Sequence, residues 1–221
     1  MKHFTICLSF ILFVSCGAQK QIIYKPILFD DLRTQLTLGY LNDRYGLKQE
    51  IPTITPKIIV LHWTAIPTLE KTFEAFNEPT LPNWRPDIKS VSGLNVSSQF
   101  VVDQDGTIYR LMPETYMARH VIGLNHCAIG VENVGGTKDM PLTKKQVEAN
   151  IWLVKYLAKK YDVEYLIGHY EYTNFEGHKL WLEKDDSYRT EKADPGEDFL
   201  NAVKKGTKQL HLKDAPKKNI N

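Results

Sequence analysis

Short apolar runs recur along the chain, separated by segments with the spacing of amphipathic helices. One of them, within residues 57–62, reads Lys-Ile-Ile-Val-Leu-His and follows Pro56. A continuous β-branched run is typical of a strand buried on both faces, so this segment predicts a central strand. Further strands are predicted at 98–102, 107–111, 128–134 and 164–168. Asp105-Gly106 between the first two of these predicts a tight hairpin.

Helical periodicity follows two threonines that can act as N-terminal caps. Thr68 precedes Leu69, Phe73 and Phe76, and Thr143 opens a longer amphipathic segment. The apolar stripe of that second helix is predicted to be Val147, Ile151, Val154, Leu157 and Ala158. A short helix is expected at 29–38 and a closing one at 198–210. This alternation predicts a mixed α/β (α+β) fold, in which a central mixed β-sheet is flanked by helices.

Prolines and a glycine interrupt residues 79–96, which predicts a long loop, and long loops in compact domains are often functional. With 221 residues, 43% of them hydrophobic, the chain suits one globular domain. We expect an N-terminal arm at 17–55, a catalytic domain at 56–212 and a flexible tail at 213–221. The net charge is only +2, and the basic residues are scattered along the chain. Both observations argue against nucleic acid as a partner.

The first residues have the layout of a secretory signal. Lys2 precedes an apolar run over residues 4–14 that is too short to span a bilayer, and Ser15-Cys16-Gly17 follows. This resembles the processing site of bacterial lipoproteins and predicts a signal peptide at 1–16, with Cys16 acylated as a membrane anchor. Such sites usually carry leucine where this chain has Phe13. An ordinary cleaved signal is the alternative.

Three side chains that can bind a metal lie just past predicted strands or in a turn. His62 and His169 each follow a strand, and Asp194 stands in Asp194-Pro195-Gly196. Two imidazoles and one carboxylate leave the fourth position of a tetrahedral zinc ion open to water, which is typical of hydrolytic sites. Taken singly, each residue also has an ordinary explanation as a packed histidine or a turn aspartate.

Six motifs form an ordered set over residues 57 to about 200. They are Val60-Leu61-His62-Trp63-Thr64-Ala65, Phe100-Val101-Val102-Asp103-Gln104-Asp105-Gly106-Thr107-Ile108, Ala118-Arg119-His120, Asn125-His126-Cys127-Ala128-Ile129-Gly130-Val131-Glu132, Ile167-Gly168-His169 and Lys192-Ala193-Asp194-Pro195-Gly196. Together they resemble the zinc-dependent amidases, a family that includes N-acetylmuramoyl-L-alanine amidases and peptidoglycan recognition proteins.

The resemblance implies a zinc ion bound by His62, His169 and Asp194. Aspartate at the third position is similar to the branch that includes bacterial anhydro-muropeptide amidases, since other members carry cysteine there. Zinc lowers the pKa of bound water to about 7 and polarises a carbonyl, and amide hydrolysis at neutral pH needs both effects.

The same resemblance assigns four further residues. Glu132 matches the catalytic glutamate, which takes the proton of water and returns it to the leaving amine. Lys192 matches the catalytic lysine, whose charge stabilises the developing oxyanion. His120 and Asn125 match residues that line the substrate groove. Without the resemblance, Glu132 is an acidic residue on a strand and Lys192 one of many solvated lysines.

Several positions depart from the family pattern or stay open. Some relatives carry tyrosine where this chain has Ser98. His126 and Cys127 can in principle bind metal, although both adjoin the strand of Glu132, and this favours a packing or groove role. If Cys16 is lipidated, Cys127 has no disulfide partner. The aromatic residues His178, Trp181 and Trp84 either stack on substrate or anchor their loops.

The leading hypothesis is hydrolysis of the amide between N-acetylmuramic acid and L-alanine, in peptidoglycan or in muropeptides released from it. A module that binds wall fragments without cutting them and a zinc peptidase acting on the stem peptide are the alternatives. The predicted signal and substrate imply an exported, periplasmic protein held to a membrane by lipid. The oligomeric state is left open.

Overall fold

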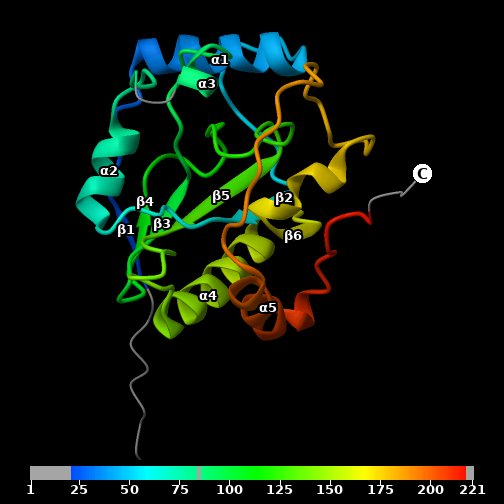
Figure 1. The fold of residues 1–221 in the computed structure, drawn as a ribbon. Helices are drawn as coiled ribbons and strands as arrows, with labels where there is room; N and C mark the ends of the chain where they lie inside the picture. Colours follow the sequence, from blue (N-terminus) through cyan, green and yellow to red (C-terminus); the bar gives the residue numbers. More distant parts are fainter. Residues whose placement is uncertain (1–20, 84–85, 218–221) are drawn as a thin grey trace, which may run out of the picture.

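The computed structural model describes residues 21–83 and 86–217 (Figure 1). The predicted signal with Cys16 and the aromatic residue Trp84 lie outside the described residues. Within the described part, one sheet has the strand order β1-β4-β3-β5-β2-β6. The strands are β1 Ile22–Tyr24, β2 Ile58–Leu61, β3 Phe100–Val102, β4 Ile108–Arg110, β5 Ala128–Asn133 and β6 Tyr165–Gly168.

The sheet is mixed, as predicted. β3, β5, β2 and β6 run parallel to one another, β4 is antiparallel to β3, and β1 is parallel to β4. The run at 57–62 forms β2, which lies between β5 and β6 and is buried along its whole length. Leu61 at its carboxyl end is opposite Val131 on one side and Gly168 on the other. The carboxyl ends of β5, β2 and β6 therefore lie together at one edge of the sheet.

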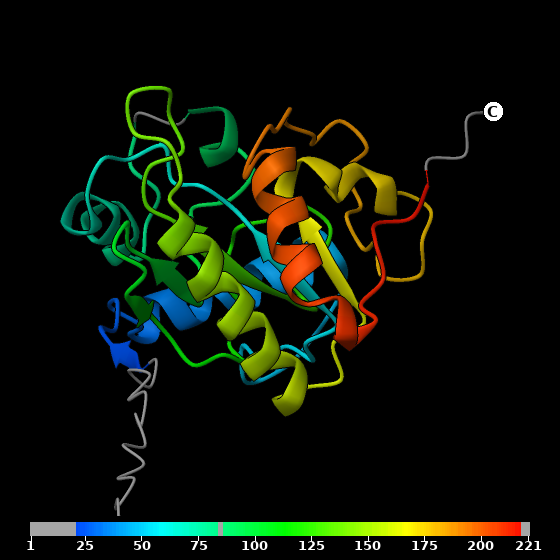
Figure 2. The same cartoon turned by 90° about the horizontal axis from the view of Figure 1, so that it is seen from below.

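The helices α4 (Lys144–Lys160) and α5 (Glu197–Gly206) cover one face of the sheet (Figures 1 and 2). Val154 and Leu157 of α4 share a core cluster with Leu200 of α5 and with the strand residues Ile59 and Ile129. The helices of the described residues are α1 Asp31–Tyr45, α2 Leu69–Asn77, α3 Pro86–Lys89, α4 Lys144–Lys160 and α5 Glu197–Gly206, with 3₁₀ helices η1 His169–Phe175 and η2 Lys208–Leu210. None of them is long and apolar enough to cross a lipid bilayer.

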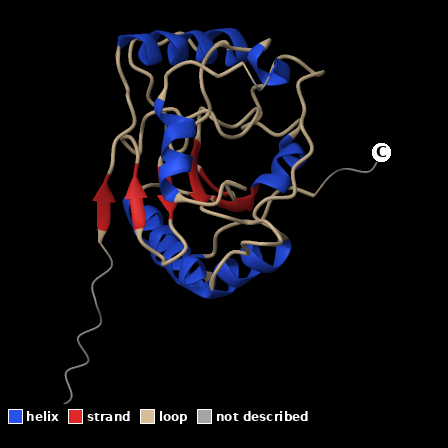
Figure 3. Ribbon diagram, turned by 60° about the vertical axis from the view of Figure 1, so that its left-hand side comes forward, coloured by secondary structure: helices blue, strands red, loops and turns tan. Residues whose placement is uncertain are grey.

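The opposite face of the sheet is covered mainly by irregular segments, with α1 beyond them (Figure 3). Ile58 and Val60 of β2 turn to this side, where they belong to a cluster with Leu124 and with Phe175 of η1. Segments of this kind leave room for a cavity at the edge where the parallel strands end.

Local sequence signals account for several boundaries. The Thr68 hydroxyl accepts a hydrogen bond from the backbone N–H of Lys71 and starts α2. Thr143 and Gln146 form a reciprocal capping box at the start of α4. The segments around Asp105-Gly106 pair as the antiparallel hairpin β3–β4. These predictions are confirmed.

Three elements differ from the sequence prediction. The helix expected at 29–38 extends to Tyr45, because Tyr40, Leu41 and Tyr45 are buried, and it ends at Gly46 in the left-handed conformation. The loop at 79–96 contains the one-turn helix α3, which starts at a proline. The division of the chain into an arm, a domain and a tail stays a prediction.

The buried face of α4 also differs from the predicted stripe. Its buried residues include Gln146, Ala149, Asn150 and Leu153, whereas Val147 and Ile151 are only partly buried. Gln146 donates to the backbone carbonyls of residues 102 and 134, and Asn150 donates to the side chain of residue 133. Polar side chains therefore occupy the sheet-facing side of this helix, and apolar periodicity does not detect them.

A buried arginine joins α1 to α2. Arg33 is 1% exposed, and its Nη2 donates to the backbone carbonyls of Phe76, Asn77 and Glu78 at 2.7–3.0 Å. These carbonyls end α2, and a positive charge at a helix C-terminus is favourable. Arg33 thereby fixes the end of a helix whose residue Phe76 lines the cavity described below.

Replacing Arg33 by methionine should lower the free energy of unfolding by about 2–4 kcal/mol, because buried carbonyls lose a charged donor. Urea denaturation of Arg33→Met beside Lys71→Met, a change at an exposed position of α2, measures the effect. Equal losses in the two variants would contradict the anchoring role of Arg33.

Candidate metal centre and active site

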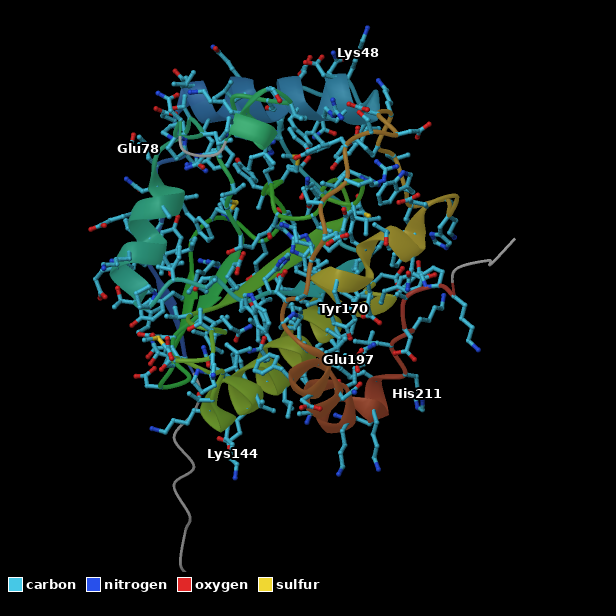
Figure 4. All side chains as sticks on the ribbon, in the orientation of Figure 1. Lys48, Glu78, Lys144, Tyr170, Glu197 and His211 are labelled. Carbon is cyan, nitrogen blue, oxygen red and sulfur yellow. The ribbon has the colours of Figure 1, made fainter. Side chains whose placement is uncertain are left out.

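The three predicted metal ligands converge at the carboxyl edge of the parallel strands. His62 directly follows β2, His169 directly follows β6, and Asp194 lies two residues before the Gly196 cap of α5. Nδ1 of His62 lies 3.0 Å from Nδ1 of His169, and Oδ2 of Asp194 lies 3.1 and 3.0 Å from these two atoms. In Figure 4, the labelled Tyr170 and Glu197 mark the elements that follow His169 and Asp194 in the chain.

This triangle of atoms suits a tetrahedral metal ion. Two ligands at about 2.0–2.1 Å from zinc in a tetrahedral site are roughly 3.3 Å apart, close to the separations seen here. All three side chains are buried and each presents one donor atom. Among the described residues, His62, His169 and Asp194 are the group of histidine, cysteine and acidic side chains close enough to hold an ion in common.

The protonation states of the group also suit a metal. Burial lowers the pKa of His169 to about 4, with further contributions from its neighbours, so the ring is neutral at pH 7. Burial opposes ionisation of Asp194, but a hydrogen bond from His169 and the contact with His62 outweigh it and hold the pKa of this carboxyl below its usual range. A neutral imidazole and an ionised carboxylate are the forms that bind metal.

A cavity of about 470 Å³ opens beside the triad. Its wall includes Glu132, Lys192, His120 and Asn125 as well as the three candidate ligands. Apolar side chains, among them Ile66 and Phe76, line much of the remainder. Residues that are distant in the sequence are thus brought to one concave site, as expected where parallel strands end together.

Glu132 reaches the cavity because of its place on β5. Val131 is opposite Leu61, so Glu132 lies beside His62 where the ladder continues past β2. Strand alternation turns Glu132 away from the face that carries α4. Lys192 is half-buried in the segment before Asp194, and its positive charge contributes to the lowered pKa of His169.

His120 and Asn125 form the wall behind His62. Nδ1 of His120 lies 3.0 Å from Nε2 of His62, and Nε2 of His120 lies 3.3 Å from the Ala128 carbonyl oxygen. The Asn125 amide oxygen accepts from the backbone N–H groups of His120 and Val121, each at 2.8 Å. Burial places the pKa of His120 well below its usual range.

His126 and Cys127 lie away from the triad. Cys127 immediately precedes β5 and is therefore at the opposite end of that strand from Glu132. Burial raises the pKa of its thiol to about 12, and the thiol donates to the carbonyl of Leu124. The His126 ring packs against Tyr45, and burial lowers its pKa to about 4. Both environments are those of packing residues.

Because this chain has Ser98 where some relatives carry tyrosine, residue 98 brings no phenol group to the cavity. Ser98 is fully buried and donates to the carbonyl of Phe100. Tyr40 and Tyr188 line the cavity from other segments.

The aromatic residues of the segment at 170–189 are tied to the protein interior. His178 contacts the rings of Tyr165 and Phe175, and Trp181 packs against Tyr172. Their geometry is that of loop anchors.

Two residues for which the sequence predicted no role, Trp63 and Asn133, also shape the site. The Trp63 ring lines the cavity and occupies the space beside Gly136, where a Cβ would come within 2.3 Å of it. In the sequence, the pair Gly135-Gly136 after a predicted strand is the signal that could have indicated this close contact. Asn133 donates to the His62 carbonyl at 2.9 Å and accepts from Asn150. No pattern in the sequence marks this buried link.

Comparison with known proteins places these features in a family. The family model described as N-acetylmuramoyl-L-alanine amidase matches residues 52–197, about two thirds of the chain. A comparison with curated proteins yields no match.

Solved structures with a similar fold include an N-acetylmuramoyl-L-alanine amidase, LysC, from Clostridium intestinale URNW, with 20% identity over 88% of this chain and 100% of that chain and a TM-score of 0.53. The endolysin amidase LysCS from the same organism is 20% identical, over 89% and 100%, at a TM-score of 0.53. Peptidoglycan recognition protein-LE in complex with tracheal cytotoxin is 15% identical, over 79% and 92%, at 0.50. These likenesses show a shared fold, and the match of the family model shows that this chain belongs to the N-acetylmuramoyl-L-alanine amidase family.

Proposed function

We propose that this protein is a zinc-dependent N-acetylmuramoyl-L-alanine amidase, which hydrolyses the amide between N-acetylmuramic acid and L-alanine in peptidoglycan or its fragments. The observation that carries the proposal is the convergence of His62, His169 and Asp194 on one cavity that also contains Glu132 and Lys192. A pocket with a metal-binding group, an acid–base residue and a cation has the components that amide hydrolysis requires.

The metal in this proposal is zinc, held by His62, His169 and Asp194. Two nitrogen donors and one oxygen donor fit the ligand preferences of zinc and leave one position for reactants. When bound there, zinc supplies Lewis acidity that activates water and polarises a carbonyl.

Glu132 is proposed as the general acid–base group. Its carboxylate accepts a proton as a water oxygen attacks the carbonyl carbon, and it delivers that proton to the amide nitrogen as the C–N bond breaks. The products are the carboxylate of the muramic lactyl group and a peptide with a free L-alanine amine. Proton transfer by a positioned side chain is worth about a hundred- to ten-thousand-fold in rate.

Lys192 is proposed to stabilise the negative charge that develops on the carbonyl oxygen. It is fixed two residues before Asp194 and lines the same cavity. A cation that interacts more strongly with the transition state than with the neutral amide accelerates the chemical step.

Substrate contacts are proposed along the wall that contains His120 and Asn125. Asn125 acts there through the backbone, because its amide oxygen holds the N–H groups of His120 and Val121. The partner is peptidoglycan or a muropeptide. One structure of similar fold contains tracheal cytotoxin, described as monomeric diaminopimelic acid-type peptidoglycan, and this supports small wall fragments as ligands.

Export to the periplasm and a lipid on Cys16 complete the proposal. The support is the signal-like sequence of residues 1–16 and the location of peptidoglycan outside the cytoplasm. The lipid would tether the domain to a membrane without a spanning helix.

Purified protein should bind one zinc ion per chain, and His169→Ala should reduce the bound zinc to a small fraction because one of three ligands is lost. Cys127→Ser should retain the full amount, since the thiol lies at the far end of β5. Atomic absorption after dialysis against metal-free buffer measures both. Loss of zinc from Cys127→Ser with retention in His169→Ala would contradict the assigned ligand set.

Digestion of muropeptides should release peptides that begin with free L-alanine, detected by mass spectrometry. Glu132→Gln should lower kcat by about a hundred- to ten-thousand-fold while zinc content stays unchanged. Glu148→Gln, at an exposed position of α4, is the matched control and should keep full activity. Cleavage between amino acids would instead identify a stem-peptide peptidase. Binding of wall fragments by the zinc-loaded protein without products would identify a recognition module.

Expression in a bacterium with radiolabelled palmitate should label the wild-type protein and place it in the membrane fraction. Cys16→Ala should lose both the label and the membrane location, whereas Cys127→Ala should keep them. An unlabelled wild-type protein released after cleavage would favour the ordinary signal peptide.

A further inference from the structure

His62 makes a contact that the proposed chemistry does not explain. Its Nδ1 faces His169 and Asp194, while its Nε2 faces Nδ1 of His120 at 3.0 Å. The two rings are almost perpendicular, at 86°, with centroids 5.1 Å apart. His120 is therefore in contact with a candidate metal ligand on the side away from the metal-binding atoms.

The outer neighbour of His120 determines which nitrogen carries hydrogen. Nε2 of His120 lies 3.3 Å from the Ala128 carbonyl oxygen, and a carbonyl only accepts hydrogen bonds. Hydrogen is therefore on Nε2 of a neutral His120, and its Nδ1 is an acceptor. His62 then donates from Nε2–H, which leaves a lone pair on its Nδ1 toward the triad, where Nδ1–H of His169 is the donor to Oδ2 of Asp194.

The position of His120 is itself tightly held. Gly130 lies on β5, and a Cβ at this position would come within 2.8 Å of the His120 ring. The absence of a side chain there therefore leaves space for the imidazole of His120. The backbone N–H of His120 donates to Asn125, whose amide nitrogen donates to the Tyr45 hydroxyl at 3.0 Å. Contacts from β5 therefore hold the ring of His120, and hydrogen bonds that lead through Asn125 to α1 hold its backbone.

We propose that His120 is a positioning residue that selects the metal-binding tautomer of His62 and fixes the orientation of its ring. The inference rests on the metal site of the proposed function and adds a second role for a residue of the wall along which substrate contacts are proposed. A partner that fixes the outer nitrogen of a ligand histidine typically changes metal affinity by about 10–100-fold.

Two replacements of His120 by side chains of nearly equal size test the role of its Nδ1 as a hydrogen-bond acceptor. In His120→Asn the side-chain oxygen can replace Nδ1 as acceptor, whereas His120→Leu removes the acceptor from a side chain of the same shape. We expect His120→Leu to weaken zinc binding about 10–100-fold and His120→Asn to restore most of the affinity. Competition with a chromophoric chelator, using zinc alone, measures the dissociation constants. His126→Phe is the control for a buried histidine outside the triad and should leave zinc affinity unchanged.

Equal zinc affinities of His120→Leu and wild type, with a raised KM for muropeptides, would overturn the proposal and leave His120 as a substrate contact. Equal losses in His120→Asn and His120→Leu would also overturn it.

The ring nitrogens of His62 give a second measurement that needs neither metal nor catalysis. Nitrogen-15 NMR of the metal-free wild-type protein should show His62 with hydrogen on Nε2 and a bare Nδ1. Hydrogen on Nδ1 of His62 would refute the proposal. Because this measurement uses the wild-type protein, it remains decisive if His120→Leu does not fold. Because both measurements avoid hydrolysis, an inactive protein that binds zinc would refute the proposed function and leave this inference standing.

Discussion

The site depends on the parallel pairing of β2 with β5 and β6. Adjacent strands lie about 4.8 Å apart, so residues that leave them at the same level are within reach of one another. The register sets Leu61 beside Val131 and Gly168, and the residues that follow are His62, Glu132 and His169. A shift of one residue in either pairing would turn a candidate site residue to the opposite face.

A buried polar network keeps these strand ends in place. Gln146 and Asn150 of α4 bond to strand-end carbonyls and to Asn133, and Asn133 in turn holds the carbonyl of His62. In a low-dielectric interior such bonds are strong when every partner is present. The helix that forms one layer of the fold therefore also fixes the backbone of a candidate ligand, which is the rigid support that a metal centre needs.

The sequence predicted most of this architecture because its signals are local. The apolar run of β2, the threonine caps of α2 and α4 and the hairpin at Asp105-Gly106 depend on neighbouring residues and were confirmed. The polar face of α4 and the full length of α1 depend on partners distant in the sequence, so periodicity missed them.

Some residues of the candidate site could likewise be predicted from local sequence patterns, and others could not. The ligand types were evident from the residues that follow two strands, whereas roles for Glu132 and Lys192 came only through the family resemblance. The contact between His120 and His62 spans 58 residues and requires three-dimensional coordinates.

The three candidate ligands come from widely separated parts of the chain, at positions 62, 169 and 194. A metal held there joins the end of a central strand to the segment that leads into α5, and so acts as a non-covalent cross-link. Cys127, the cysteine within the described residues, is a free thiol, so no disulfide ties these segments in that part of the protein. Because an ion bound only by the folded state stabilises it by mass action, the supply of the proposed metal would set the stability of this protein as well as the proposed activity.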